Sequence, residues 1–145
     1  MRGLTGGERS LLRLRLLSAS RSPLITRAGD RPSFDGEELV VVPSPFFPHR
    51  ITEGYSPPFG EIVEAINGIH VKNLAHLVAL LRDCHDQFLK IEFSGRLNET
   101  MIFPRAAMDL ATEEILADNG VRSQGSPDMM AIWHSKADTA PAKNK

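Results

Sequence analysis

The side chains with the greatest chemical capacity in this chain are a single cysteine and its neighbours. Cys84, His85 and Asp86 stand in a row, and these are the residue types of a cysteine nucleophile, its base and the acid that orients the base. Consecutive side chains at the end of a helix point in different directions, so the three cannot line up for proton transfer. We interpret the stretch as the last turn of a helix that carries a half-buried cysteine.

The five histidines do not have the spacing of metal ligands. They stand at positions 49, 70, 76, 85 and 134, and none of these intervals matches a zinc-binding pattern. Glu113 and Glu114 are adjacent on a predicted helix, where only one of them can face a given site, so we interpret them as solvated surface. The sequence contains neither a G-x-G-x-x-G motif nor a P-loop. We therefore expect no metal and no cofactor.

Hydrolysis by a serine triad is not expected from this chain either. Such a triad needs a serine in a glycine-rich turn whose N–H groups stabilise the oxyanion. The "GSP" at Gly125–Pro127 is not that turn, and 145 residues leave no room for the double barrel of a serine protease. We expect a non-catalytic chain, either a fragment of a longer protein or a stand-alone copy of one domain.

Length and composition predict one modest domain with tails. Of the 145 residues, 41% are hydrophobic and 24% are charged, which is within the ordinary range of folded domains. Apolar runs stay well short of the roughly 20 residues that a membrane span requires. The single cysteine excludes an internal disulfide and leaves the cellular compartment open.

Charge is unevenly distributed along the chain. Residues 1–34 hold seven arginines against Glu8 and Asp30, a balance of +5, so the net charge of −1 leaves −6 for residues 35–145. We predict that residues 1–37, which are rich in Arg, Ser and Gly, form a basic, disordered linker. An organelle transit peptide is the alternative. The body of the chain lacks the clustered basic stripe that nucleic-acid binding needs, so no nucleic acid is expected there.

Residues 38–118 predict a small α+β unit with an antiparallel sheet. The run "ELVVV" at 38–42 predicts a strand, and a proline-rich loop with apolar anchors follows it. Asn67-Gly68 is a strong turn signal, and Asn73 is a good helix N-cap. Further expected elements are strands at 62–66 and 69–71, a helix at 74–82, a hairpin from 87 to 103 and a helix at 106–118. Residues 119–145 are expected to be a partly disordered extension, with "MMAIWH" as a short helix or strand.

The stretch "GEIVEAINGIHVKNLAHLVALLRD", followed by "FLKIEFSGRLNETMIF", resembles a PDZ domain of the Deg/HtrA serine proteases. Its cadence is a strand that ends in an apolar-Asn-Gly turn, a short strand, a short helix and a hairpin. "EELVVVPSPFFPHRITEGY" and "ATEEILADNGVRSQGSPD" further resemble the second PDZ-like domain of plant-type Deg proteases and their bacterial relatives. The resemblance covers about residues 38–118 and implies a small PDZ-like β-sandwich or barrel with two helices.

A PDZ-like fold implies a groove between one strand and one helix, where an incoming extended polypeptide pairs with the free strand edge. By the resemblance, His76 and Leu80 face this groove. In many PDZ domains a histidine at this place hydrogen-bonds a hydroxyl of the ligand, and the alternative for His76 is a solvated surface histidine. The apolar residues of the other helix face are expected to pack on the sheet: Leu74, Leu77, Val78 and Leu81.

The sequence departs from the family pattern just before the first strand. PDZ domains that bind a C-terminal carboxylate use a loop with two glycines, whose N–H groups converge on the anion. "SFDGEEL" instead has one glycine and three acids, so we expect an internal polypeptide segment, or a neighbouring domain of the same protease, as the partner. In plant-type Deg proteases the second PDZ-like domain is associated with subunit assembly, which also implies a homo-oligomer through the parent protease. Four apolar loop residues would suit such a contact, or would only pack locally: Phe46, Phe47, Tyr55 and Phe59.

Two functions remain open on the sequence alone. The first is a non-catalytic PDZ-like module of a Deg/HtrA-type protease that binds a polypeptide by strand addition beside the helix at 74–82. The second is a free-standing interaction protein whose basic arm at 1–34 contacts RNA or an anionic membrane. Binding through the arm would weaken steeply with salt, whereas binding in the groove would change little.

Overall fold

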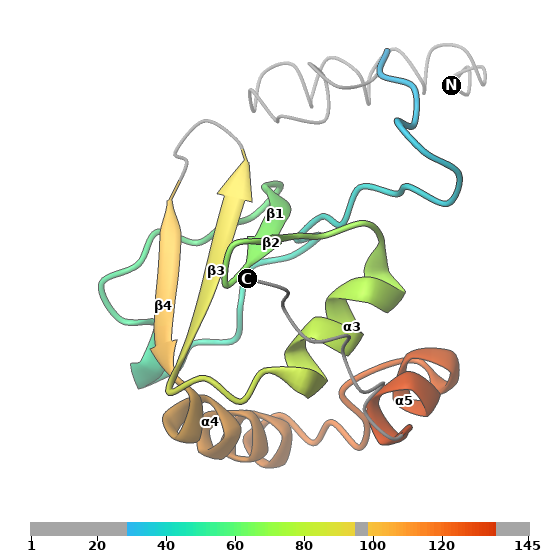
Figure 1. The fold of residues 1–145 in the computed structure, drawn as a ribbon. Coiled ribbons are helices and arrows are strands. Elements are labelled where there is room, and N and C mark those ends of the chain that lie inside the picture. Colours follow the sequence, from blue (N-terminus) through green and yellow to red (C-terminus); the bar gives the residue numbers. More distant parts are fainter. Residues whose placement is uncertain (1–28, 95–98, 136–145) are drawn as a thin grey trace, which may run out of the picture.

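The sheet of this protein has four antiparallel strands. The computed structural model describes residues 29–94 and 99–135. The strands are β1 (Ile62–Ile66), β2 (Ile69–His70), β3 (Phe88–Ser94) and β4 (Thr100–Pro104). Their order across the sheet is β2-β1-β3-β4 (Figure 1). The strands β1 and β3 are therefore central, and β4 is an edge strand.

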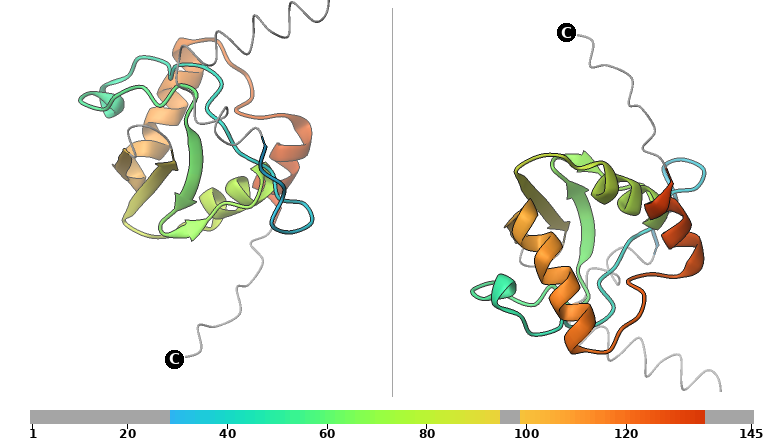
Figure 2. Two further views of the ribbon diagram at one scale, coloured as in Figure 1. Left: turned by 90° about the horizontal axis from the view of Figure 1, so that it is seen from above. Right: turned by 90° about the horizontal axis from the view of Figure 1, so that it is seen from below.

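The helices pack around this sheet. They are the single turn η1 (Arg50–Thr52) and the α-helices α3 (Leu74–Asp83), α4 (Arg105–Asp118) and α5 (Pro127–His134). Figure 2 shows α4 beside η1, and α5 beside α3. The predicted α+β class with an antiparallel sheet is confirmed. The sheet is open rather than closed into a barrel, and the described residues hold three α-helices where we expected two, because "MMAIWH" belongs to α5.

None of the helices in the described ranges is both long enough and apolar enough to cross a membrane. The linker predicted for residues 1–37 lies outside the described residues as far as residue 28, and residues 136–145 of the C-terminal extension do too. The domain boundaries at residues 38 and 118 stay predictions.

The turn between β1 and β2 follows from Asn67-Gly68. Both residues have positive φ, 48° at Asn67 and 78° at Gly68, a region that asparagine and glycine tolerate better than other residues. Ile66 pairs with Ile69 across the turn. The predicted two-residue hairpin is therefore confirmed.

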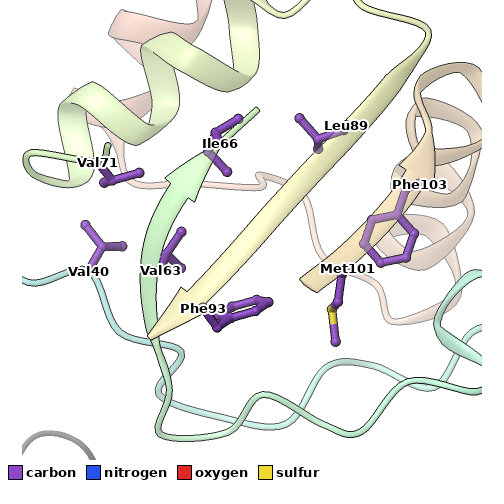
Figure 3. Packing of buried hydrophobic residues seen from close by; sticks show 8 residues of the cluster. All are labelled: Val40, Val63, Ile66, Val71, Leu89, Phe93, Met101 and Phe103. Carbon is purple, nitrogen blue, oxygen red and sulfur yellow. The ribbon is translucent and has the colours of Figure 1, made fainter. Parts of the chain in front are cut away.

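The core lies on the inner face of the sheet. Alternation along β3 turns Leu89 and Phe93 inward, and Met101 and Phe103 of β4 face the same side. Leu89 is fully buried. Figure 3 shows eight residues of this cluster: Val40, Val63, Ile66, Val71, Leu89, Phe93, Met101 and Phe103.

Helix α3 covers the core with a face that differs partly from the predicted one. Leu77 and Leu81 pack against the core cluster as expected, and Leu80 packs there as well. Leu74 is 45% exposed, so its predicted packing on the sheet is wrong. The first turn of α3 is tied to residues before the sheet rather than to the sheet itself. Val78 lines a cavity towards α5, because α5 covers that side of the helix.

Helix α5 is held against the end of α3 by a guanidinium. Arg82 donates from Nη1 to the C=O of Ile132 at 2.9 Å. The same carbonyl also accepts from the N–H of Ser135 at 3.1 Å, and a cation at the end of a helix complements the helix dipole. Residues 127–134 of the predicted extension are thus part of the fold.

Candidate functional site

Residues 38–42 form an extended segment along β1 instead of a regular strand. Val41 makes a single antiparallel bridge with Ile62. The C=O of Val40 accepts from the backbone of β1 at 2.8 Å, and the N–H of Val42 donates to a carbonyl just before β1 at 3.0 Å. The strand predicted at 38–42 is therefore not formed as a regular strand; an extended segment lies beside β1 instead, held through its even-numbered residues.

The odd-numbered residues of this segment leave a free backbone edge. Backbone groups of successive residues in an extended chain point to opposite sides, so the N–H and C=O groups of Leu39 and Val41 point away from β1. No hydrogen bond among the described residues uses these four groups. An edge of unpaired groups is a template for another extended chain.

The first turn of α3 is tied to the beginning of this edge. The N–H of Glu38 donates to the C=O of Lys72 at 2.9 Å. Asn73 caps α3 by accepting from the N–H of His76 at 2.9 Å. Its Nδ2 donates to the C=O of Gly36 at 3.0 Å. One asparagine therefore starts the helix and holds it beside the edge.

His76 strengthens the same junction. Its Nδ1 accepts from the N–H of Lys72 at 3.2 Å, so the neutral ring carries its proton on Nε2. Burial, followed by the positive charges of Lys72 and His70, lowers the pKa of His76, which keeps the ring neutral at pH 7. Its Nε2–H has no partner in the described ranges. A ligand atom that meets this group would have to be a hydrogen-bond acceptor.

Leu80 is the second residue that we expected in the groove. It lies one turn after His76 on α3, is partly buried and packs against the core cluster. The structure thus places His76 at the junction with the free edge and Leu80 at the margin of the core. The assignment of both residues to a ligand groove stays a prediction.

The surroundings of the edge combine acidic and apolar side chains. Asp35 and Glu38 are exposed, and Phe34 and Leu39 are each 40% exposed. Gly36, the single glycine of this stretch, has a φ of 82° and offers its C=O to the N-cap of α3. The two carboxylates disfavour an incoming anion and favour a cation.

An apolar cavity lies between the proline-rich loop and α4. Its volume is about 320 Å³, at the lower end of the range of ligand pockets. Phe46 and Phe47 line it from the loop and Ala111 lines it from α4. Phe46 is 41% and Phe47 49% exposed. Two of the predicted loop residues therefore border a cavity that is separate from the edge.

The other two predicted loop residues, Tyr55 and Phe59, are placed differently. The hydroxyl of Tyr55 donates to the C=O of Ile102 at 3.0 Å and accepts from the N–H of Ile102 at 3.1 Å. The Tyr55 ring packs edge-on against Phe103, with centroids 5.4 Å apart. Tyr55 is thus anchored on the edge strand β4, whereas Phe59 is 57% exposed.

A cluster of ionisable groups joins the same loop to α4. Glu114 accepts from Nε2 of His49 at 2.9 Å and from Nη2 of Arg50 at 3.2 Å. His49 carries its proton on Nε2 because its Nδ1 accepts from the N–H of Ile51. The hydrogen bond from His49, followed by the charge of Arg50, lowers the pKa of Glu114. Glu114 is exposed, as interpreted from the sequence, and its carboxylate also holds the loop at His49 and Arg50 against α4.

Cys84 and Asp86 share one partner, because Nδ2 of Asn67 donates to Sγ of Cys84 at 3.5 Å as well as to Asp86, whereas His85 contacts a backbone carbonyl. Cys84 is the C-cap of α3 and half-buried. Nδ1 of His85 lies 2.6 Å from the C=O of Asp83, and Asp86 accepts from Nδ2 of Asn67 at 2.7 Å. Within the described residues, no group of three or more His, Cys, Asp and Glu side chains could hold a metal ion.

The sequence did not predict the hydrogen bonds between Tyr55 and Ile102, or those that His49 and Arg50 donate to Glu114. The partners are separated by 47 residues in the first case and by 64 or 65 in the second. The one available signal was the residue type, since a lone tyrosine in a proline-rich loop usually finds a partner for its hydroxyl when it is buried.

Comparison with known proteins agrees with this architecture. A model of the PDZ domain family matches residues 15–128. The chain is 30% identical over 109 residues to protease Do-like 2, chloroplastic, of Arabidopsis thaliana, an alignment that covers 75% of this chain and 18% of that protein. It is 33% identical over 95 residues to the Arabidopsis thaliana protein named protease Do-like 11, mitochondrial, with 66% of this chain and 17% of that protein covered. The chain therefore spans less than a fifth of the length of these relatives. With a family match over most of its length and an antiparallel α+β fold, this chain belongs to the PDZ domain family.

Proposed function

We propose that the chain is a peptide-binding module of a Do-like protease that adds a polypeptide segment to its free edge. The observation that carries this proposal is the pair Leu39 and Val41, whose backbone groups have no partner among the described residues and lie beside the first turn of α3. Hydrogen bonds to the main chain would supply affinity, and side-chain contacts would supply selectivity. The similarity to Do-like proteases supports the link to a protease.

In this function His76 is the side chain best placed to form a selective hydrogen bond with the ligand. Its Nε2–H donates to an oxygen of the bound segment, while its Nδ1 keeps the junction in place. Leu80 lies one turn further along α3 and contributes an apolar contact at the margin of the core. The chain itself carries out no hydrolysis, because strand addition needs no catalytic group.

A panel of immobilised peptides tests the edge directly. The purified chain should bind members of the panel, and Val41→Pro should weaken that binding about three- to tenfold, which corresponds to one lost main-chain hydrogen bond of about 0.5–1.5 kcal/mol. Proline is tolerated at an edge position whose N–H does not pair within the sheet, so the variant should remain folded by circular dichroism. Wild-type affinity in a folded Val41→Pro chain would place the binding site elsewhere.

A pair of leucine variants tests the helix side of the groove. Leu80→Glu should weaken peptide binding in a chain that remains folded by circular dichroism, and Leu110→Glu controls for the added charge, because Leu110 is 66% exposed on α4. Equal binding by both variants would remove Leu80 from the groove. Casein hydrolysis by the purified chain would overturn its non-catalytic role.

We further propose that the cavity at Phe46 and Phe47 contacts a neighbouring domain of the same protease. Two half-exposed phenylalanines beside an apolar cavity of about 320 Å³ support this assignment, and so does the much greater length of the relatives. In the protease that carries this domain, Phe47→Ser should lower the assembly size in sedimentation experiments. Phe59→Ser is the matched control, and an equal effect of both variants would contradict the assignment.

A further inference from the structure

A groove lies at the junction of α3, α4 and α5. Residues 119–126 lead from α4 into α5, which packs against α3 (Figure 1). The main part of the groove has a volume of about 390 Å³ and is lined by Leu81 of α3, Met108 of α4 and Trp133 of α5. A smaller part of about 140 Å³ continues to Met129. Leu81, Gln124 and Trp133 line both parts, so the two parts form one three-helix groove.

Two arginines hold the walls of the three-helix groove in place. Arg105, at the start of α4, donates from Nη1 to the C=O of Leu81 at 2.9 Å and ties α4 to the end of α3. Arg82 donates to the C=O of Ile132 and ties α5 to the same end of α3. A site whose walls are already in place loses less free energy to ordering when a ligand binds. The groove is therefore open to a ligand without a rearrangement of the helices.

One side of the three-helix groove is acidic. Among the described residues, the charged side chains that line it are Arg105, Asp109 and Glu113. The guanidinium of Arg105 is engaged by its bond to Leu81 and by Asp109, whose Oδ1 lies 3.3 Å from its Nε. Within the part of the chain that the structure describes, Glu113 has no hydrogen bond or ion pair. The unmatched charge of Glu113 favours a cation in the groove.

The centre and the other side of the groove are aromatic and apolar. Trp133 is half-buried, and the face of an indole ring attracts a cation. Arginine suits this combination because its planar guanidinium stacks on an aromatic ring and pairs with a carboxylate, while its aliphatic stem packs on apolar surface. Met129 and Met130 line the smaller part, and methionine adapts to apolar groups of different shapes. The groove therefore fits a basic side chain with an apolar one close to it.

We propose that the three-helix groove binds a segment of a partner polypeptide, with an arginine side chain between Trp133 and Glu113 and an apolar side chain beside Met129. The occupant is a polypeptide because the two parts of the groove suit two different kinds of side chain, which one small cation cannot supply. This inference goes beyond strand addition. The groove lies at the last turn of α3, whereas the free edge at Leu39 and Val41 lies beside its first turn.

Fluorescence of the full chain measures this binding, because Trp133 is the one tryptophan of the sequence. The probes are blocked hexapeptides without aromatic residues, each with one arginine and one leucine at a different spacing among glycines. At least one spacing should give a saturable change of emission. The same peptide with citrulline, a neutral isostere, in place of arginine should bind about tenfold or more weakly. Serine in place of leucine should weaken binding about threefold or more.

Variants of the chain locate the peptide. Glu113→Gln should weaken binding of the arginine peptide about three- to tenfold and leave binding of the citrulline peptide unchanged. The matched control is Asp118→Asn, which removes one negative charge from an exposed position at the end of α4, outside the groove. Asp118→Asn and Val41→Pro should both bind the peptide like the wild type. If Glu113→Gln fails to fold by circular dichroism, the comparison of arginine with citrulline still decides.

The contrary results are distinct from one another. Unchanged Trp133 emission with every peptide, or equal binding of the arginine and citrulline peptides, would overturn the proposal. Equal loss in Glu113→Gln and Asp118→Asn would also overturn it, because the attraction would then depend on net charge alone. Ethylguanidinium that binds as tightly as the best peptide would make the ligand a small organic cation instead.

Two further results would assign the groove or the peptide differently. Emission that changes with protein concentration in the absence of peptide would mean that a second copy of the chain occupies the groove, which overturns an external partner. Loss of binding in Val41→Pro would move the peptide to the free edge, which supports the proposed function and overturns the groove. Binding that needs Glu113 and not Val41 supports the groove whether or not the edge accepts a strand.

Discussion

Replacement of Asn67 separates the two physical contributions of the β1–β2 turn. The residue has a φ of 48°, and its side chain also joins the turn to the next strand. Its Oδ1 accepts from the N–H of Lys90 at 2.6 Å, and its Nδ2 donates to Asp86 at 2.7 Å and to the C=O of Phe88 at 3.2 Å. The informative variants are Asn67→Gly, which keeps the backbone conformation accessible, and Asn67→Ala, which does not.

The magnitudes follow from these contacts. A neutral hydrogen bond contributes about 1 kcal/mol net and a charge-assisted one about 1.5 kcal/mol or more, so loss of the Asn67 side chain should cost about 3 kcal/mol in Asn67→Gly. A left-handed conformation costs alanine about 1 kcal/mol more, so Asn67→Ala should lose about 4 kcal/mol. Asn67→Asp keeps the acceptor for Lys90 but loses both donor bonds and adds a charge near Asp86, so about 2–3 kcal/mol should be lost.

Urea unfolding measures these differences. The chain has one tryptophan, Trp133, which is half-buried on α5 and serves as the fluorescent probe. The slope of the free energy of unfolding against urea should be unchanged, so the midpoints report stability alone. Wild-type stability of Asn67→Gly would refute the role of the side-chain bonds. Equal stabilities of the glycine and alanine variants would refute the role of the backbone conformation.

Four further residues give smaller tests. Tyr55→Phe keeps the ring but loses both bonds to β4, so it should cost about 1–2 kcal/mol in urea unfolding; an unchanged midpoint would contradict this. The pKa of His76 is lowered below its ordinary value of 6.5, so the unfolded chain binds more protons than the folded chain below that pH. The free energy of unfolding of the wild type should therefore fall as the pH drops below 6.5. His76→Asn, which retains a hydrogen-bond acceptor, should make the free energy of unfolding depend less on pH in this range. The pKa of Glu114 is lowered below 4.5, so the ionised carboxylate stabilises the fold above pH 4.5, and this stabilisation is lost as the pH falls through the pKa of the folded state. In Glu114→Gln this pH-dependent loss of stability should be absent. Arg82→Met should release α5, seen as a red shift of tryptophan emission and faster proteolysis, and unchanged emission would argue against the guanidinium bond as its anchor.

The elements that the sequence predicts correctly are those determined by one or two residues. Asn67-Gly68 specifies a turn because few other pairs tolerate positive φ twice. Asn73 starts α3 because its side chain satisfies an N–H that the helix leaves unpaired. Alternation in "FLKIEF" likewise identifies Leu89 and Phe93 as inward-facing. Local chemistry is sufficient in each case.

The orientation of α3 could not be predicted in the same way. Helical spacing marks an apolar stripe, but Leu80 extends that stripe to one side and Val78 to the other. Which of these two residues faces the core depends on α5, because Val78 lines the cavity next to α5 and Leu80 packs against the core. A helix that packs against two elements is apolar on two sides, and periodicity alone does not assign each side to its neighbour.

The candidate site was predictable to the extent that it depends on position along the chain. His76 was placed near the groove by its distance from Asn67-Gly68, and the structure puts it at the junction with the free edge. The tautomer of His76 depends on the hydrogen bond from the N–H of Lys72, and the position of residues 36–38 beside α3 depends on the hydrogen bond that the C=O of Gly36 accepts from Asn73. No sequence pattern indicates either bond.

The edge strand β4 and the extended segment 38–42 differ in how their outward-facing backbone groups are occupied. On β4, the hydroxyl of Tyr55 occupies both backbone groups of Ile102, and Pro104 has no N–H to offer. Proteins cover their edges in such ways to prevent pairing with other chains. At Leu39 and Val41 the described residues provide no such cover. On β4 a tyrosine hydroxyl and a proline thus occupy the outward backbone positions, whereas Leu39 and Val41 have no such partner among residues 29–94 and 99–135, and this difference is the reason for proposing strand addition at Leu39 and Val41.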